Sequence, residues 1–324
     1  MNSKSLVLTL LFNTTKVVLL TLVMFMIVST AMTLTGVAAE AEAAGPAAGE
    51  AAQASEPTAS SNADEGRVAM IFLGVCFFQT LALCLAILRS SWRGWRLVAA
   101  IFTVMVVVTA ILSHIDSLFF LRDMSRSLIA RLAIASALTA AVFSPIAVWF
   151  LGGFRRTDDA PAAHSIQPRF NQRWAIVLLA LAVLHIVTYF VFGYYVAWQS
   201  PEVRAFYDGE DPGSFYLQMV SVVRDTPWLM PVQVVRGLLW GLMAVILGVI
   251  LSGPRWSAAL IAAGVLVALF ALPLAIPNPL MPEAVREAHF LETVLSRGLY
   301  GLLAVWFVRS RFVPRGAELS AAEV

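Results

Sequence analysis

The sequence has few of the charged residues that cover the surface of a water-soluble protein. Asp, Glu, Lys and Arg together make up 13% of its 324 residues, and only two of the 22 basic residues are lysines. Soluble domains average about 25% charged residues. Hydrophobic residues instead make up 60% of the chain, and its mean hydropathy is +0.81. This composition predicts an integral membrane protein surrounded by membrane lipids.

The sequence also lacks the motifs of common cofactor sites and active sites. It contains no GxxxxGK phosphate-binding run, no HExxH zinc motif and no GxSxG nucleophile motif. Its formal net charge of +2 provides no basic excess for binding nucleic acid. We therefore expect neither a nucleic-acid partner nor a cofactor, and no motif identifies a reaction.

Cysteine is scarce as well. Cys76 and Cys84 fall in one apolar segment, where a helix would separate them by about 12 Å along its axis. That distance is too long for a disulfide, and the spacing is not that of metal ligands. Both cysteines are expected to face the protein core or the lipid.

Long apolar runs dominate the rest of the sequence. About 20 apolar residues are needed for a helix to cross a membrane. Eight segments meet this requirement: residues 16–38, 67–88, 95–115, 128–151, 174–198, 231–252, 256–276 and 289–308. Transmembrane β-strands would alternate apolar and polar residues, and these runs do not. We predict an all-α bundle of about eight transmembrane helices, or seven if the first segment is cleaved.

Basic residues are distributed unevenly between the ends of these runs. Thirteen lysines and arginines flank one set of ends, six flank the other set, and three lie within the runs. The positive-inside rule then places both chain termini in the cytoplasm of a protein in the plasma (inner) membrane.

Four regions follow from this pattern. Residues 1–39 are a transmembrane anchor or a signal peptide, since "GVAAEA" contains small residues suited to cleavage after Ala39. Residues 40–66 contain no large apolar run and read as a flexible extracytoplasmic linker. Residues 67–315 form a seven-helix membrane domain, and residues 316–324 form a cytoplasmic tail.

Two short helices are predicted in the connection after residue 198. Ser200 can cap a first helix that begins at Pro201, and "DGEDPG" ends it. A second stretch begins at Ser214 and places its apolar residues at helical spacing. We expect both helices on the outer membrane surface.

Polar residues form a stripe along the last apolar run. At about 100° per residue, one face collects His289, Glu292, Thr293, Ser296 and Tyr300, with Arg297 at its border. Such a stripe should face protein or a water-filled cavity, because lipid cannot satisfy it. It is either the wall of a binding pocket or a polar seam between helices.

His114 and Asp116 are expected at a similar depth at the end of the third run. Together with His289 and Glu292 they make two imidazoles and two carboxylates, which could hold a metal ion, relay protons or supply a catalytic base. The alternative is a structural hydrogen-bonded cluster. A spacing of two does not put His114 and Asp116 on one helix face, so the metal site is the weaker interpretation.

Three arginines lie inside predicted helices, namely Arg131, Arg236 and Arg297. The only acids near their level are Asp116 and Glu292, so an anion could balance the surplus charge. A planar guanidinium suits carboxylate or phosphate. The alternative for Arg131 and Arg236 is that they extend to the lipid headgroups.

His185 lies near the centre of the fifth run. A histidine at mid-membrane depth is a candidate for ligand or proton binding, although two neighbours could satisfy a neutral imidazole in a purely packing role. In the sixth run Gly237, Gly241 and Gly248 form a groove of small residues. This groove would let another helix approach closely, either within the bundle or in a homo-oligomer.

These patterns together predict a polar cavity that opens to the extracytoplasmic side between the third, fourth, sixth and eighth runs. We expect the protein to bind or transport an anionic solute or a lipid headgroup there. Its ligand-binding residues would be Arg131, His185, Arg236, Arg297 and Tyr300, with His185 and Glu292 as proton sites. Two alternatives remain: an enzyme at the outer leaflet with His289 or His114 as general base, and a membrane scaffold.

Overall fold

The structure is a computed structural model that describes residues 3–37, 59–121, 124–154, 172–211, 213–278 and 281–312. Within these ranges the chain is mostly helical and forms no strands, and seven helices are long and apolar enough to cross a membrane. The prediction of an all-α polytopic membrane protein is confirmed. The greater part of the predicted linker, residues 40–58, the cleavage position after Ala39 and the predicted cytoplasmic tail lie outside the described residues.

The chain divides into two compact units. Unit 1 comprises Met1–Leu88, Arg93–Arg155 and Ala275–Leu280. Unit 2 comprises Arg89–Trp92, Arg156–Leu274 and Met281–Val324.

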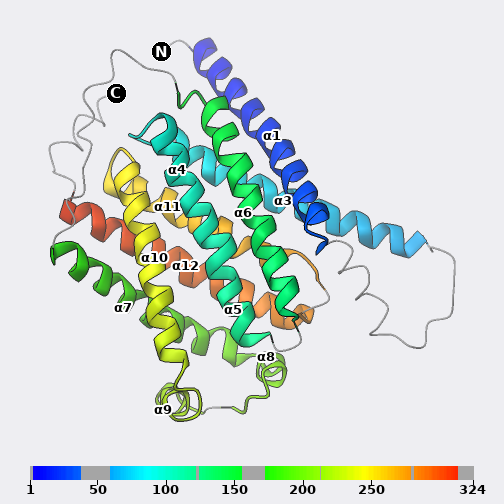
Figure 1. Cartoon of the computed structure of the whole chain (residues 1–324), viewed down its shortest axis with the longest axis vertical. Helices are drawn as coiled ribbons and strands as arrows, with labels where there is room; N and C mark the ends of the chain where they lie inside the picture. The colour runs from blue at the N-terminus through cyan, green and yellow to red at the C-terminus, as the bar shows by residue number, and fades with distance from the viewer. Residues whose placement is uncertain are drawn as a thin grey trace. The chain divides into compact units, whose positions relative to one another are not determined.

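Unit 1 contains the helices of the N-terminal half of the chain (Figure 1). These are α1 (Ser3–Leu34), α3 (Ala59–Leu88), α4 (Gly94–Met105), the π-helix η1 (Val106–Leu112), α5 (Ser113–Phe120) and α6 (Arg126–Phe150). Helix α1 packs on α3 and α6, and α4 packs on α6. Helix α3 begins inside the stretch predicted as linker, and α4, η1 and α5 join into one span that extends beyond residue 115.

Unit 2 contains the remaining helices. They are α7 (Gln172–Tyr195), η2 (Ala197–Gln199), α8 (Pro201–Phe206), α9 (Phe215–Asp225), α10 (Leu229–Ile250), α11 (Arg255–Phe270) and α12 (Glu283–Phe312), with the short η3 at Leu272–Ala275. Helix α12 packs on α7, α10 and α11, and α7 also packs on α10. Helix α8 contacts α12 as well, so the connection after α7 lies at the end of unit 2 where α12 begins. We call this end the α8 end.

One of the eight predicted spans is short. Helix α11 has 16 residues, or about 24 Å, whereas the hydrocarbon core of a bilayer is about 30 Å thick. The chain continues as the 3-10 helix η3, which contains Pro273. Proline lacks a backbone N–H and disfavours an α-conformation at the preceding residue, so the α-helix ends before the apolar run does.

The glycines of α10 allow two neighbouring helices to approach closely. A Cβ atom on Gly237 would lie 2.8 Å from Cα of Ala182 in α7, and one on Gly248 would lie 2.8 Å from the side chain of Val308 in α12. Gly241 also faces α7. Of the two uses predicted for this groove, these glycines serve close approach within the bundle, while homo-oligomerisation stays a prediction.

Arg309 near the end of α12 is also used inside unit 2. The sequence pattern placed it among the basic residues at the cytoplasmic boundary, but its side chain is 3% exposed. It donates hydrogen bonds to the carbonyl oxygens of Gly248, Leu251 and Gly253. These bonds satisfy carbonyls that the end of α10 leaves without helical partners.

Replacing Gly237 with alanine is expected to destabilise unit 2. The added Cβ would push against the backbone of α7, and such overpacking costs about 1 to 3 kcal/mol. Gly264→Ala is the matched control, because a Cβ on Gly264 of α11 meets nothing within 4 Å. Thermal unfolding of the detergent-purified proteins should show a lower melting temperature for Gly237→Ala only. Equal melting temperatures would contradict this close approach of α7 and α10.

Candidate functional site

His185 lies at the centre of a buried polar cluster in unit 2. Its Nε2 is 3.1 Å from Oε1 of Gln233, and its Nδ1 is 2.9 Å from Nη1 of Arg297. A guanidinium group can only donate hydrogen bonds, so Nδ1 must accept. Nε2 then carries the imidazole hydrogen and donates it to the amide oxygen. The imidazole therefore links α10 to α12 in its neutral form.

A second guanidinium reaches the same amide. Arg236 Nη1 lies 3.2 Å from Oε1 of Gln233, so this oxygen accepts from both Arg236 and His185. These two donors fix the orientation of the amide, because its NH2 group could accept from neither. The side chains of Gln233 and both arginines are at most 2% exposed. Nε2 of Gln233 is buried and has no hydrogen-bond partner.

Aromatic rings surround the two guanidinium groups. Cζ of Arg297 is 4.9 Å from the ring centroid of Trp240 and 5.8 Å from that of Tyr300. Cζ of Arg236 is 5.6 Å from the ring centroid of Tyr189. These are cation–π distances, which help to offset the desolvation of the guanidinium groups. Trp240 Nε1 and the Tyr300 hydroxyl are both buried without a hydrogen-bond partner.

Helical spacing brings these side chains onto facing surfaces. Gln233, Arg236 and Trp240 follow one another at intervals of three and four residues on α10, so they share a face. Arg297 and Tyr300 do the same on α12, about 21 and 26 Å from the start of that helix. We call the group formed by His185, Gln233, Arg236, Trp240, Arg297 and Tyr300 the His185 cluster.

The structure brings together four of the five predicted ligand-binding residues, and their role stays a prediction. The fifth, Arg131, belongs to α6 of unit 1 and has an exposed side chain, which fits the alternative of an arginine that extends to the lipid headgroups. Sequence reasoning missed Gln233 and Trp240. Gln233 could have been found as a polar residue in an apolar run, three residues before Arg236.

A second polar group lies at the α8 end. His289 Nδ1 is 3.2 Å from Oε2 of Glu292, and its Nε2 is 3.1 Å from the hydroxyl of Tyr207. The first contact is the i, i+3 pairing expected from the sequence. Tyr207 was not predicted, because it follows α8 in a separate connection. His289 and Glu292 are mostly buried, with side-chain exposures of 21% and 12%.

The other predicted imidazole and carboxylate, His114 and Asp116, lie on α5 in unit 1. Within the described ranges no three His, Cys, Asp or Glu side chains are close enough to hold a metal ion. His114 and Asp116 thus belong to one unit and His289 and Glu292 to the other, and the metal site considered for these four residues stays a hypothesis.

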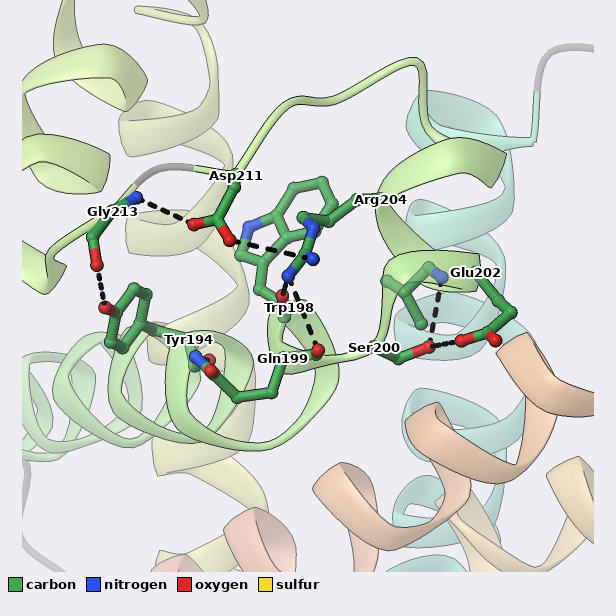
Figure 2. A network of polar contacts seen from close by, with 9 residues as sticks. Tyr194, Trp198, Gln199, Ser200, Glu202, Arg204, Asp211 and Gly213 are labelled. Atoms are coloured by element: carbon green, nitrogen blue, oxygen red, sulfur yellow. Dashed lines mark hydrogen bonds and ion pairs between the residues drawn. The ribbon is translucent and has the colours of Figure 1, made fainter.

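The connection after α7 is folded by its own hydrogen bonds (Figure 2). Arg204 Nη1 donates to the carbonyl oxygen of Trp198 at 2.7 Å and to that of Gln199 at 3.4 Å. Its Nη2 lies 3.7 Å from a carboxylate oxygen of Asp211, and the other oxygen of Asp211 accepts from the backbone N–H of Gly213. One guanidinium thus joins both ends of the connection.

The predicted Ser200 cap is confirmed, and Ser214 caps the second helix in the same way. The Ser200 hydroxyl accepts from the backbone N–H of Val203 at the start of α8, and Ser214 accepts from that of Leu217 in α9. Ser200 also donates to Glu202 at 2.7 Å (Figure 2). This hydrogen bond lowers the pKa of the Glu202 carboxyl, because it stabilises the charged form.

The folded connection holds Tyr207 against α12. The Tyr207 ring packs edge-on against Trp198 at 6.0 Å and against His289 at 5.6 Å, measured between ring centroids. The backbone at Asp208 turns with a φ of 53°, a left-handed conformation that aspartate tolerates. The position of the tyrosine hydroxyl over His289 therefore depends on the hydrogen bonds of Arg204.

Comparisons with known proteins give no relative for this chain. No family model matches it, and no match is found among curated proteins or among solved structures.

Replacing Arg204 with alanine is expected to open the connection after α7. The change removes the donor to two backbone carbonyls and the partner of Asp211. Limited proteolysis should then cut between residues 196 and 213 at least several times faster than in the wild type. Arg224→Ala is the control, since Arg224 is 84% exposed and pairs with its neighbour Asp225. Equal cleavage rates in the two variants would show that Arg204 does not hold the connection.

Proposed function

We propose that the protein binds an anionic ligand at the His185 cluster and transports it or senses it there. One observation carries this proposal. Gln233 Nε2, Trp240 Nε1 and the Tyr300 hydroxyl are three fully buried donors without an acceptor, and they lie beside two guanidinium groups. Buried donors are costly unless an acceptor meets them. An anion supplies several acceptor atoms and a charge opposite to that of the arginines.

The chemistry of these donors favours an oxyanion. Carboxylate, phosphate and sulfate oxygens each accept more than one hydrogen bond, and a planar guanidinium can bind two of them in parallel. The same oxygens occur in free solutes and in the headgroups of anionic lipids. Trp240 and Tyr300 add flat apolar surfaces, which would suit a ligand whose carbon skeleton is small or planar.

We expect a ligand to reach the proposed site from the extracytoplasmic side. The distribution of basic residues favours cytoplasmic termini in the plasma membrane, and this orientation would put the α8 end outside. Polar residues continue from that end along α12 as far as Tyr300, and mostly apolar residues follow them. A ligand would therefore enter from the outside, and its further path would require a conformational change.

Added oxyanions are expected to raise the thermal stability of the detergent-purified protein. A ligand that binds only the folded state stabilises it by about 2.7 kcal/mol at one hundred times its dissociation constant. We would compare sulfate, phosphate and acetate with chloride at equal ionic strength. A second set of measurements compares micelles containing phosphatidylglycerol with micelles containing phosphatidylcholine. This comparison distinguishes binding of an anionic lipid headgroup from binding of a free anion.

Two arginine variants identify the site. Arg297→Lys keeps the charge but loses the planar guanidinium, so it should abolish the stabilisation by oxyanions. If Arg297→Lys does not fold, Arg236→Lys tests the same expectation. Arg131→Met, in unit 1, should respond as the wild type does. The proposal is wrong if neither the oxyanions nor phosphatidylglycerol stabilise the wild type, or if Arg297→Lys and Arg236→Lys both respond in full.

The group at the α8 end supports a second candidate function, an enzyme acting at the outer leaflet. A carboxylate, an imidazole and a hydroxyl follow one another at 3.2 and 3.1 Å through Glu292, His289 and Tyr207. This order suits a general base oriented by an acid. If it is catalytic, Tyr207→Phe and His289→Asn should each slow hydrolysis of ester or phosphoester probes at least about a hundredfold. Equal rates in all three proteins would leave binding, or a scaffold role, as the function.

A further inference from the structure

The His185 cluster contains a proton-binding atom in contact with one of its two guanidinium groups. Nδ1 of His185 accepts a hydrogen bond from Arg297, so this atom carries a lone pair. A proton bound at Nδ1 would occupy the lone pair and break that hydrogen bond. Arg297 would then be released from α7 and could turn its donors to another acceptor.

The surroundings of His185 determine when such a proton can bind. In the described part of unit 2, the charged groups facing it are Arg236 from α10 and Arg297 from α12. The other titratable groups near it are Tyr300 from α12 and Tyr189 from its own helix, with ring centroids at 6.1 and 6.2 Å. Protonation would therefore add a third positive charge to a buried cluster that already holds two.

We infer that the anion and one proton bind this cluster cooperatively, with the proton on Nδ1 of His185. This inference rests on the proposed function. A bound anion would offset the third positive charge and would accept the hydrogen bonds that Arg297 gives up. Coupling between two ligands is reciprocal, so a protonated His185 must also favour the anion. In transport, the cluster would carry a proton together with the anion.

The polar stripe on α12 extends from the α8 end to the level of His185. It begins at Tyr207, His289 and Glu292, which are joined by hydrogen bonds. Ser296 follows one turn later, about 6 Å along the helix axis, and its Oγ accepts from Nε of Arg297 at 3.4 Å. Thr293, Ser296 and Tyr300 are all buried on this face. On this inference the proton would enter at the group at the α8 end and bind at His185.

The test is a titration of the purified protein with sulfate between pH 5.5 and 8.0. Sulfate keeps its charge over this range, so a change in affinity reports a proton on the protein. For one coupled proton, the affinity should rise by up to about tenfold for each unit by which the pH falls. The titration is measured by isothermal titration calorimetry. Repeating it in buffers of different ionisation enthalpy gives the number of protons taken up, which should approach one per bound sulfate.

Two variants assign the proton to a residue. His185→Gln offers both an acceptor for Arg297 and a donor for Gln233, but it does not titrate, so it should bind sulfate with no pH dependence. Glu292→Gln should keep the pH dependence and take up protons more slowly in a stopped-flow measurement with a pH indicator. A pH dependence that survives His185→Gln, or that Glu292→Gln abolishes, would overturn the assignment to His185.

The remaining outcomes separate this inference from the proposed function. If sulfate binds the wild type with the same affinity at every pH and without proton uptake, the coupling is wrong and the anion site stands. If sulfate binds at no pH, the coupling of sulfate to His185 is overturned. The stability measurements with phosphate, acetate and lipid then show whether the cluster binds any other anion.

Discussion

The hydrogen bond between Arg297 and His185 is the interaction on which the rest of unit 2 depends. It joins α12 to α7 at mid-span, and the same imidazole continues to Gln233 and Arg236 on α10. Lipid offers no partner to a guanidinium or an amide, so these side chains must find one another inside the bundle. Three helices are therefore held in one register by four polar residues.

That arrangement is possible only because α7 and α10 approach closely. Gly237 lies one residue after Arg236 and against the backbone of Ala182, three residues before His185. A larger residue at Gly237 would separate the helices at the level where the imidazole meets the amide. Small residues and polar residues thus have complementary roles, since the glycine provides the short distance that the hydrogen bond requires.

The connection after α7 gives the α8 end a second fixed point. Its fold comes from backbone carbonyls satisfied by Arg204, and it places Tyr207 over His289. Polar residues then continue along α12 from His289 to Tyr300. The two polar groups of unit 2 are consequently parts of one buried face, and a proposal for either must take account of the other.

The membrane class, the all-α architecture, seven of the eight spans and the Ser200 cap were predictable from the sequence, because they depend on local composition and spacing. The sequence also selected His185, Arg236, Arg297 and Tyr300, since polar residues in apolar runs stand out. The three-dimensional packing was needed to establish which of them meet, that Gln233 and Tyr207 complete the two groups, and that Arg309 is buried. Those contacts join residues far apart in the chain, and the spacing within one helix does not specify which neighbour a polar side chain will meet.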